Sequence, residues 1–559
     1  MHFPGMRQSS SMLGVPTAPG VRLAVRPISL VVPAFSGMDG VLLLLGLSSG
    51  LLLASWSLAW SIPTLPYIAG AYSTSLDHAI WSLTFYLLAW ALAVVPATWL
   101  YQRFGELRMF QISLILLMVA TLPDIFSDHF GLFLGGRFLQ GMAAGFLTPL
   151  TRRLLIRYAP PRWQKTAADL SIVNLVLPLL AGPSLAGWIA YTWDWRAAAV
   201  LTFPVGLLAL GTVSALLRDD PNERVCQPFD WIGLALLAAW SAIFQLVLNR
   251  GEDWNWWDAP TIRWLTGLGA VLLVAFFLWE KHQPQPCLDL SLLRRRNYVL
   301  ALPALVFGWG LLLGGNSLFV SALISHANYS AFWAGVVLLP MALGGVPLIA
   351  VMGPISHRVN PRWLATICFG FVALYGFTTE LNLHSNLSSL LLSRLIEGIA
   401  IGFYLVPLSL IMFSRLPQRR LPAAATLQNF VRILGGAYLS SAFSALWMRH
   451  GDTFRAHLAW QSPSLPSLSL LEHWPVSGPA AQALSIQRLT TQSAVLSMQS
   501  MLWLWGWMAL VVLALVWLTK GPYRRRAGQV QRVTIEQQIM ESAGFDAEPS
   551  REEDAKHAP

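Results

Sequence analysis

The chain has 559 residues, of which 55% are apolar and only 11% are charged. This composition excludes an ordinary soluble domain and predicts a protein that crosses a lipid bilayer several times, in contact with membrane lipid. The net charge of +10 does not indicate a nucleic-acid partner, because the basic residues form short clusters between apolar segments, where cytoplasmic loops carry them.

The first 40 residues mix Pro, Ser and Gly with scattered Arg and lack a compact apolar stretch followed by a small-residue cleavage site. We therefore expect a cytoplasmic N-terminal tail and no cleaved signal peptide. Met38 lies so close to the first long apolar segment that the true start of the protein stays open.

Apolar windows of about 20 residues, the length that spans a bilayer core, follow one another along the rest of the chain. Fourteen can be placed, near residues 42–66, 79–99, 109–124, 131–151, 168–191, 197–217, 231–249, 262–281, 299–323, 332–354, 362–381, 388–413, 422–447 and 499–519. Because the count is even and Arg and Lys cluster in alternate loops, both termini are predicted to be cytoplasmic. The Ser-, Pro- and Gln-rich stretch 449–498 is predicted to be a long external loop.

An internal repeat links two of these windows. The segment GRFLQGMAAGF begins at Gly136, and SRLIEGIAIGF begins at Ser393. An offset of 257 residues pairs Arg137 with Arg394 and Gln140 with Glu397, and the same offset continues into the next loop and helix without a gap. The repeat predicts two structurally duplicated halves, which is how many secondary transporters are built.

Each copy carries one arginine and two glycines at four-residue spacing: Arg137, Gly141 and Gly145 in the first, and Arg394, Gly398 and Gly402 in the second. Residues at this spacing lie on one face of a helix. Because small residues allow another helix to approach closely, both arginines are predicted to point into the bundle. The alternative, that each arginine extends to the lipid head groups, stays open because the sequence does not fix their depth.

Two motifs now resemble the major facilitator superfamily, and within it the fourteen-span drug:proton antiporters of the EmrB/QacA type. GRFLQGMAAG looks like the fourth-helix motif of the superfamily, whose arginine is implicated in proton transfer, and Arg137 is the matching position. AGPSLAGW, from Ala181, resembles the fifth-helix motif of exporters. Its Gly182, Pro183 and Gly187 would kink and thin a helix where two halves rock against each other.

Longer stretches sharpen the resemblance, which covers about residues 40–520. They are WDWRAAAVLTFPVGLL from Trp193, FDWIGLALLAAWSAIFQLVLNRGEDWNWW from Phe229, LDLSLLRRRNY from Leu288, and SRLPQRRLPAAATLQNFVRILGG from Ser414, which includes Arg432.

The resemblance implies an all-α polytopic membrane protein with the major facilitator fold in the bacterial inner membrane. The expected parts are a cytoplasmic tail at 1–40, a six-helix bundle at 41–218, two extra central spans with cytoplasmic linkers at 219–297, a second six-helix bundle at 298–520 that contains the loop 449–498, and a disordered cytoplasmic tail at 521–559.

The resemblance also implies export of lipophilic or amphipathic drugs in exchange for protons by alternating access. The proton-motive force would be the energy source, with no cofactor and no metal. Proteins of the EmrB type work with a periplasmic adaptor and an outer-membrane channel, for which 449–498 is a plausible docking surface. A dedicated exporter of one metabolite or siderophore, or a sensor on a transporter frame, remain alternatives. An enzyme is not indicated, since the chain lacks an HExxH motif and a nucleotide-binding GxxxxGK[ST] loop.

Two departures from the family pattern affect the expected mechanism. The loop TWLYQRFGELRMF keeps Arg103, Gly105 and Arg108, but Gln102 replaces the usual acid, so the latch between the halves must differ. In the first span, Ser57 stands in the place of the aspartate that many fourteen-span exporters carry. Proton coupling through that position is therefore not available.

Glu397 is then the deepest candidate carboxylate for proton transfer, one helical turn from Arg394. Whether it carries a proton or forms a fixed ion pair stays open at this stage. The remaining acids near the ends of spans are expected to be solvated or to cap helices: Asp39, Asp124, Asp169, Asp230, Glu280 and Glu380.

Several aromatic residues could line a cavity suited to flat lipophilic molecules. They are Trp56, Trp60, Trp90, Trp309 and Tyr404, with Ser57 and Arg432 as polar neighbours. The alternative is that they belong to interfacial belts or to lipid-facing packing. The three cysteines, Cys226, Cys287 and Cys368, are far apart, and we expect apolar fillers or loop thiols instead of a disulfide or a metal site.

Overall fold

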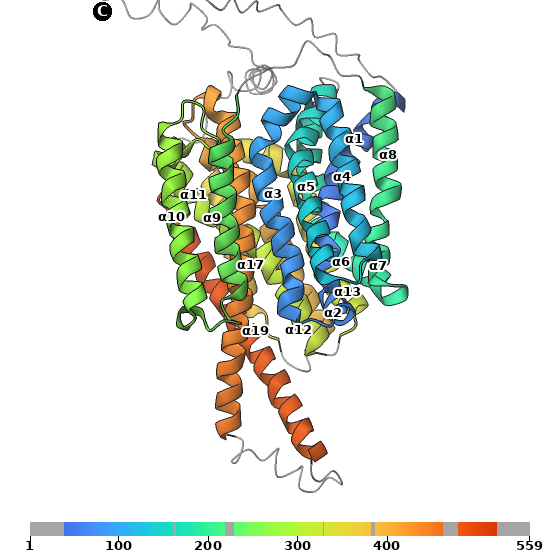
Figure 1. The fold of residues 1–559 in the computed structure, drawn as a ribbon, viewed down its shortest axis with the longest axis vertical. Helices are drawn as coiled ribbons and strands as arrows, with labels where there is room; N and C mark the ends of the chain where they lie inside the picture. Colours follow the sequence, from blue (N-terminus) through green and yellow to red (C-terminus); the bar gives the residue numbers. More distant parts are fainter. Residues whose placement is uncertain are drawn as a thin grey trace, which may run out of the picture. The chain divides into compact units, whose positions relative to one another are not determined.

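The computed structural model describes residues 38–159, 164–217, 228–327, 329–381, 386–461 and 479–521. Helices make up nearly all of these ranges, and none of them contains a β-strand (Figure 1). The predicted terminal tails lie outside the described residues except for 38–40 and 521. The prediction of an all-α protein is confirmed for the described part of the chain.

The helices of the first part of the chain are α1 (Met38–Ala59), α2 (Ser61–Ala71), α3 (Leu76–Phe104), α4 (Glu106–Phe126), α5 (Phe130–Tyr158), α6 (Gln164–Thr192), α7 (Trp195–Val200) and α8 (Thr202–Leu216). The central pair is α9 (Trp231–Arg250) and α10 (Pro260–His282), with short 3₁₀ turns η3 (Trp256–Asp258) and η4 (Leu290–Arg294). The last part contains α11 (Arg296–Gly310), the π-turn η5 (Leu311–Gly315), α12 (Asn316–Ser325), α13 (Ala331–Arg358), α14 (Pro361–Thr378), α15 (Leu387–Gly402), α16 (Leu405–Phe413), the 3₁₀ turn η6 (Gln418–Arg420), α17 (Leu421–Gln461) and α19 (Pro479–Trp517).

Twelve helical stretches among the described residues are long and apolar enough to cross a membrane. Helices α14 and α17 are not among the twelve, although they lie at the predicted windows 362–381 and 422–447. Every predicted window therefore falls on a helical segment, while the total of fourteen spans stays a prediction.

Side-chain caps explain where several helices begin. The hydroxyl of Ser75 accepts a hydrogen bond from the backbone N–H of His78 at the start of α3, and Ser330 does the same for Trp333 at the start of α13. Such caps satisfy N–H groups that have no partner inside the helix. Between α3 and α4, Gly105 has φ = 100°, a conformation that glycine adopts without strain. The sharp reversal after α3 therefore depends on this glycine.

The repeat offset is visible in the helices themselves. Helix α5 begins at Phe130 and α15 at Leu387, and α6 begins at Gln164 and α17 at Leu421, so both pairs are separated by the predicted 257 residues. The first helix of each part is also interrupted. The regular helix breaks at Trp60 between α1 and α2, and it gives way to a π-turn at Leu311–Gly315 between α11 and α12.

Helices α17 and α19 are much longer than a bilayer requires. They contain 41 and 39 residues, which corresponds to about 60 Å each, whereas the hydrocarbon core is about 30 Å thick. Figure 1 shows both helices continuing past the ends of their neighbours. The indole N–H of Trp447 donates to the carbonyl of Ala494 (3.2 Å), and His450 Nδ1 lies 2.7 Å from Ser500 Oγ, so the two helices pack on each other.

The stretch predicted as a long loop, 449–498, is therefore helical on both sides, at 449–461 and at 479–498. The predicted external loop thus contains helix at these described residues, while its location outside the bilayer stays a prediction. The Ser and Pro residues concentrate in 462–478, which lies outside the described part, whereas the sequence after Pro479 is rich in Ala, Gln and Leu. Proline is favoured at the first helical position and the other three are good helix formers, so a helix beginning at Pro479 is the local preference.

Candidate functional site

The guanidinium of Arg137, on α5, is completely buried. Its Nη1 donates to the carbonyl of Ser57 and to Gln140 Oε1, both at 2.6 Å, and Nη2 donates to Ser61 Oγ at 3.1 Å. Two rings cover the guanidinium, with centroids 5.1 Å (Trp60) and 4.8 Å (Tyr86) from its carbon. The prediction that Arg137 points into the bundle is confirmed, and extension to the lipid head groups is excluded.

The side chain of Gln140 connects this arginine to a carboxylate on the neighbouring helix α4. Its Oε1 accepts from Arg137, while its Nε2 donates to Asp124 Oδ2 at 2.6 Å. Asp124 is completely buried, and its Oδ1 has no hydrogen-bond partner among the described residues. We call this arrangement the first arginine cluster: Arg137, Gln140 and Asp124.

The expectation that Asp124 is a solvated or capping residue at a span end is therefore wrong. Helix α4 continues to Phe126 and packs closely along α5. Asp124 therefore faces Gln140 across the contact between the two helices and is shielded from solvent. A carboxylate placed at that depth is expensive unless a donor faces it, and the amide of Gln140 supplies one.

The second arginine cluster is built around Arg394 on α15. Its guanidinium is completely buried and Glu397 is 1% exposed. Nη1 donates to Glu397 Oε2 at 2.5 Å and to Asn316 Oδ1 at 2.6 Å, and Nη2 donates to the hydroxyl of Tyr375. The ring of Phe319 lies 3.7 Å from the guanidinium carbon. The sequence-predicted pair of Arg394 and Glu397 is thus formed in the interior.

The two clusters place their acids differently. In the second, the carboxylate belongs to the helix of the arginine and contacts it directly. In the first, an amide occupies that position, and the carboxylate comes from the adjacent helix. Ser57, which replaces the family's aspartate, contributes only its backbone carbonyl, because its hydroxyl has no partner among the described residues.

The predicted packing glycines lie against backbone of a neighbouring helix. A Cβ on Gly141 would collide with the carbonyl of Tyr86 on α3, and one on Gly398 would collide with the backbone of Met341 on α13. At Gly145 and Gly402 the nearest atoms to an added Cβ belong to side chains of the same two neighbouring helices, Ala93 of α3 and Leu348 of α13. The glycine face therefore brings α5 onto α3 and α15 onto α13, as the spacing predicted.

The Gly-Pro motif joins α6 to α13. A Cβ on Gly187 would collide with the carbonyl of Ala331, and the hydroxyl of Ser184 donates to the carbonyl of Gly335 at 2.6 Å. Gly182 lies under Ala59 and Trp56, while Pro183 lies inside the continuous helix. The motif thus allows close approach of two helices from different parts of the chain, and its role in rocking stays a prediction.

The loop motif between α3 and α4 has an ionic contact that sequence reasoning missed. Arg103 lies over the ring of Trp99 (5.2 Å), and Arg108 is exposed. Glu106, at the start of α4, accepts from Arg153 Nε at 2.5 Å and from Arg157 Nη1 at 3.0 Å. This carboxylate ties the loop to α5, four residues after the position where Gln102 replaces the usual acid.

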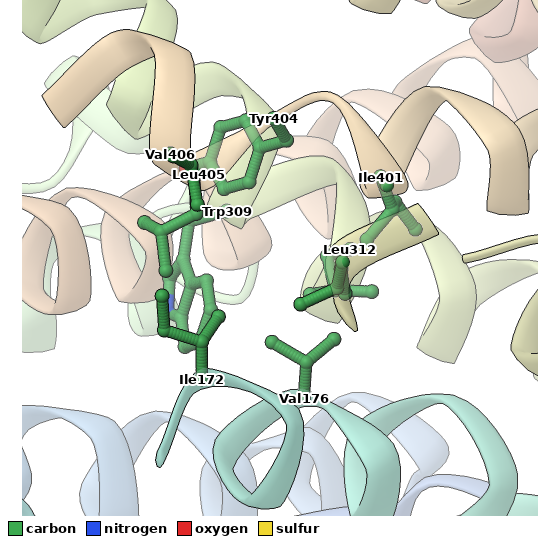
Figure 2. A pocket seen from close by; sticks show the side chains of 10 residues that line it. Ile172, Val176, Trp309, Leu312, Ile401, Tyr404, Leu405 and Val406 are labelled. Carbon is green, nitrogen blue, oxygen red and sulfur yellow. The ribbon is translucent and has the colours of Figure 1, made fainter. Parts of the chain in front are cut away.

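Of the predicted cavity residues, the structure brings Trp309 and Tyr404 together. They line a narrow cavity between α6, α11, α13, α15 and α16, with Ile172 and Val176 on the opposite wall (Figure 2). Its volume of about 10 Å³ holds about one water molecule. Trp90 packs edge-on against Trp309, with centroids 6.5 Å apart.

Two predicted cavity residues lie elsewhere. The indole of Trp56 donates to the carbonyl of Ala198 at 3.1 Å, and Trp60 stacks on Trp195 at 6.2 Å beside Arg137. Arg432, on α17, is 1% exposed, and its guanidinium carbon lies 3.9 Å from the ring centroid of Trp309.

Comparison with known proteins decides the family. The sequence model of the Major Facilitator Superfamily matches residues 47–440 of this chain. The chain belongs to this superfamily. It is an integral, multi-pass membrane protein.

Two characterised relatives of the chain are exporters or resistance proteins by name. The chain is 28% identical to the multidrug export protein EmrB of Escherichia coli K12 over 473 residues, covering 83% of this chain and 92% of that protein. It is 26% identical to the fatty acid resistance protein FarB of Neisseria gonorrhoeae over 470 residues, covering 83% of this chain and 93% of that protein.

A solved structure is similar in fold. It is that of a bacterial homolog to the human lysosomal transporter Spinster, in an inward-facing and unoccupied conformation, with a TM-score of 0.55 and 16% identity. The likeness covers 87% of this chain and 97% of that chain. Together with the superfamily match, it confirms the predicted major facilitator fold.

Beside the superfamily core, α9 and α10 meet at a small polar cluster. Asp230 caps α9 by accepting from the N–H of Gly233 (2.8 Å), as expected. Glu280 is 4% exposed, so the expectation of a solvated residue is wrong; its Oε1 accepts from Cys287 Sγ at 2.6 Å and from the N–H of Leu288 at 3.2 Å. The loop after α10 folds back over this carboxylate and covers it.

The carboxylate oxygens of Asp230 and Glu280 and the sulfur of Cys287 lie within 4.8 Å of one another. Burial, together with the neighbouring Glu280, raises the pKa of the Cys287 thiol. Cys368 is buried, as expected of an apolar filler, and Cys226 lies outside the described residues.

The remaining predicted span-end acids are nearer to water. Asp39 and Glu380 are exposed, and Asp169 is half-buried.

Proposed function

We propose that this member of the superfamily is a proton-coupled antiporter that exports lipophilic or amphipathic drugs by alternating access. The observation that carries the proposal is the pair of arginine clusters, because each places one titratable carboxylate in the membrane interior next to a buried arginine. Intramembrane carboxylates of this kind serve proton pathways. The names of the relatives, multidrug export protein and fatty acid resistance protein, support the export of apolar compounds.

Glu397 is the proposed main proton carrier. Protonation removes its charge and weakens the contact with Arg394, whose Nη1 and Nη2 keep hydrogen bonds to Asn316 and Tyr375. Two nitrogens of the guanidinium therefore keep hydrogen-bond partners in both protonation states, whereas Nε has no partner among the described residues. The charge of Arg394 loses its acidic partner when Glu397 is protonated, so proton loading would change the energy of this buried site. Asp124 is the proposed second titrating group, acting on Arg137 through Gln140.

The proton-motive force is sufficient as the energy source, and the proposal includes no cofactor. One proton that crosses about 100 mV supplies about 2.3 kcal/mol, and one pH unit adds about 1.4 kcal/mol. A one-for-one exchange with a neutral substrate could then hold a gradient of several hundredfold.

The narrow cavity at Trp309 and Tyr404 supports alternating access. A space for about one water molecule admits no drug, so substrate entry requires the helices around it to separate. The seam of α6 and α13, with backbone contacts at Gly187 and Gly335, is the proposed surface on which the two six-helix halves, 41–218 and 298–520, move.

The test is substrate-dependent proton uptake in proteoliposomes that carry an imposed pH gradient. Glu397→Gln and Arg137→Ala are each expected to abolish proton uptake. Glu380→Gln is the control for Glu397→Gln, because Glu380 is an exposed acid that precedes α15, the helix of Glu397. Unchanged uptake in both Glu397→Gln and Arg137→Ala would refute the mechanism. Loss of proton uptake with retained downhill substrate exchange would identify coupling as the lost step.

We infer further that the protein lies in the bacterial inner membrane with both termini in the cytoplasm. The basis is the clustering of Arg and Lys in alternate loops, and cysteine accessibility at each terminus in intact cells checks it. On this orientation, the paired ends of α17 and α19 extend into the periplasm. They are the proposed docking surface for an adaptor protein that leads to an outer-membrane channel.

The adaptor proposal is tested by site-specific photo-crosslinking. Trp460 is 83% exposed and Ile486 is 63% exposed, so a crosslinker at either position is expected to capture a periplasmic protein in whole cells. A crosslinker at Trp264, which is 80% exposed on α10, is the control. Capture at Trp264 alone, or at none of the positions, would contradict the assignment.

A further inference from the structure

Arg432 on α17 is a buried cation that lacks an acidic partner. It is 1% exposed. Its Nη2 donates to Asn429 Oδ1 at 3.2 Å, whereas Nε and Nη1 have no hydrogen-bond partner among the described residues. A guanidinium has five N–H donors, and leaving a buried charged donor unsatisfied is costly.

The other two arginines buried in the membrane interior show what is missing. Arg394 contacts Glu397 directly, and Arg137 reaches Asp124 through Gln140. Within the described residues Arg432 forms no ion pair with an acid. A buried guanidinium that has unsatisfied donors and no acidic partner among the described residues favours an anionic ligand.

The surroundings of Arg432 are aromatic and border the narrow cavity. Its guanidinium carbon lies 3.9 Å from the ring centroid of Trp309, and Trp309 forms part of the cavity wall with Tyr404 (Figure 2). The indole N–H groups of Trp309 and Trp90 also have no partner among the described residues. The site therefore combines the guanidinium of Arg432, two indole N–H groups without partners among the described residues, and flat aromatic surfaces.

We propose that Arg432 binds the acidic head group of an amphipathic substrate, and that the preferred substrates are organic acids with an aromatic or aliphatic body. The planar guanidinium matches a carboxylate through two parallel hydrogen bonds. Nε and Nη1 are the nitrogens left without partners, and one of them can form such a pair together with the remaining N–H of Nη2. The apolar body of the substrate would pack on Trp309, Trp90 and Tyr404 when the cavity opens. This assignment rests on the proposed export function and specifies its substrate class.

The test is equilibrium dialysis of three probes of the same shape against the purified full-length protein. They are 2-naphthoate, the neutral 2-naphthamide and the cationic 2-naphthylmethylammonium. The wild type is expected to bind naphthoate at least tenfold more tightly than naphthamide. Arg432→Gln is expected to weaken naphthoate binding by roughly 10- to 100-fold, with naphthamide nearly unchanged, and Arg432→Lys to lie between. Arg263→Gln, at an exposed arginine of α10, is the control.

A wild type that does not prefer naphthoate over naphthamide would overturn the proposal, even if Arg432→Gln fails to fold. Equal loss of all three probes in folded Arg432→Gln would do the same, since it would indicate a structural role. A lipid phosphate offers the same chemistry, so the dialysis is repeated with dioleoylphosphatidylglycerol. Competition by this lipid that disappears in Arg432→Gln would assign the site to lipid and refute the substrate claim. Naphthoate binding without any naphthoate transport would instead refute the export function and leave the binding site standing.

Discussion

Replacing Gly145 by alanine tests the close packing of α5 on α3. An ideal Cβ at this position would lie 2.5 Å from the Cβ of Ala93 and 2.7 Å from the carbonyl oxygen of Trp90. Carbon atoms in contact prefer about 3.5–4.0 Å, so the two helices must separate by about 1 Å. Overpacking of this kind costs about 1–3 kcal/mol.

Gly135, on the same helix, provides a matched control. A Cβ there would meet nothing within 4 Å, and alanine is a better helix former than glycine by about 0.5–1 kcal/mol. We therefore expect Gly145→Ala to lower the thermal unfolding midpoint of the detergent-purified protein, and Gly135→Ala to leave it unchanged or raise it. Because both variants gain the same helix propensity, the free energies of unfolding should differ by the overpacking cost, about 1–3 kcal/mol.

The separation should also reach the site, because α5 carries Arg137 and the contact at Gly145 includes the backbone of Trp90. Gly145→Ala should then reduce proton uptake, whereas Gly135→Ala should not. Equal unfolding midpoints and equal uptake in the two variants would refute the claim that glycine brings these helices together.

Three further predictions follow from the site and from the loops outside the spans. Asp124→Asn should sharply reduce substrate-dependent proton uptake in proteoliposomes, whereas Asp128→Asn, at a side chain that is 96% exposed, should not; equal uptake would remove Asp124 from the proton path. Burial lowers the pKa of His326, at the end of α12, below its ordinary 6.5. Because the folded protein then keeps this histidine neutral, its stabilising contribution is present above pH 6.5 and is lost as the pH falls below it. The unfolding midpoint should therefore drop between pH 7.5 and 5.5, and less so in His326→Gln. Cys287 should react slowly with a maleimide at pH 7.5 and faster in Glu280→Gln, because Glu280 helps to hold the thiol protonated; mass spectrometry of the labelled protein checks this, and equal rates would contradict it.

Periodicity and duplication predicted the part of the site that lies within single helices. Four-residue spacing was enough to place Arg137 and Arg394 on glycine faces, because side chains one helical turn apart must share a face. It was also enough to pair Arg394 with Glu397, which lies one turn further along the same helix.

The spacing of residues within one helix does not predict which side chains of two different helices contact each other. Asp124 was misjudged because its distance from the end of a span, and not the packing of α4 on α5, was used to estimate its exposure. The repeat nevertheless contained an indication that Gln140 has a partner on another helix. Gln140 occupies the position of Glu397, and an amide that gives its oxygen to an arginine still needs an acceptor for its N–H groups. That acceptor had to come from another helix, and Asp124 supplies it.

The long helix α17 has a mechanical consequence. It runs without a break from Leu421 to Gln461, and Arg432 lies near its beginning. From Arg432 to its far end the helix rises about 44 Å, at 1.5 Å per residue. A tilt of about 10° at Arg432, small for a helix in a moving bundle, would swing that end through about 8 Å. If the proposed opening of the cavity tilts α17 at Arg432, the helix would act as a lever, and the position of its far end would report whether the cavity is open.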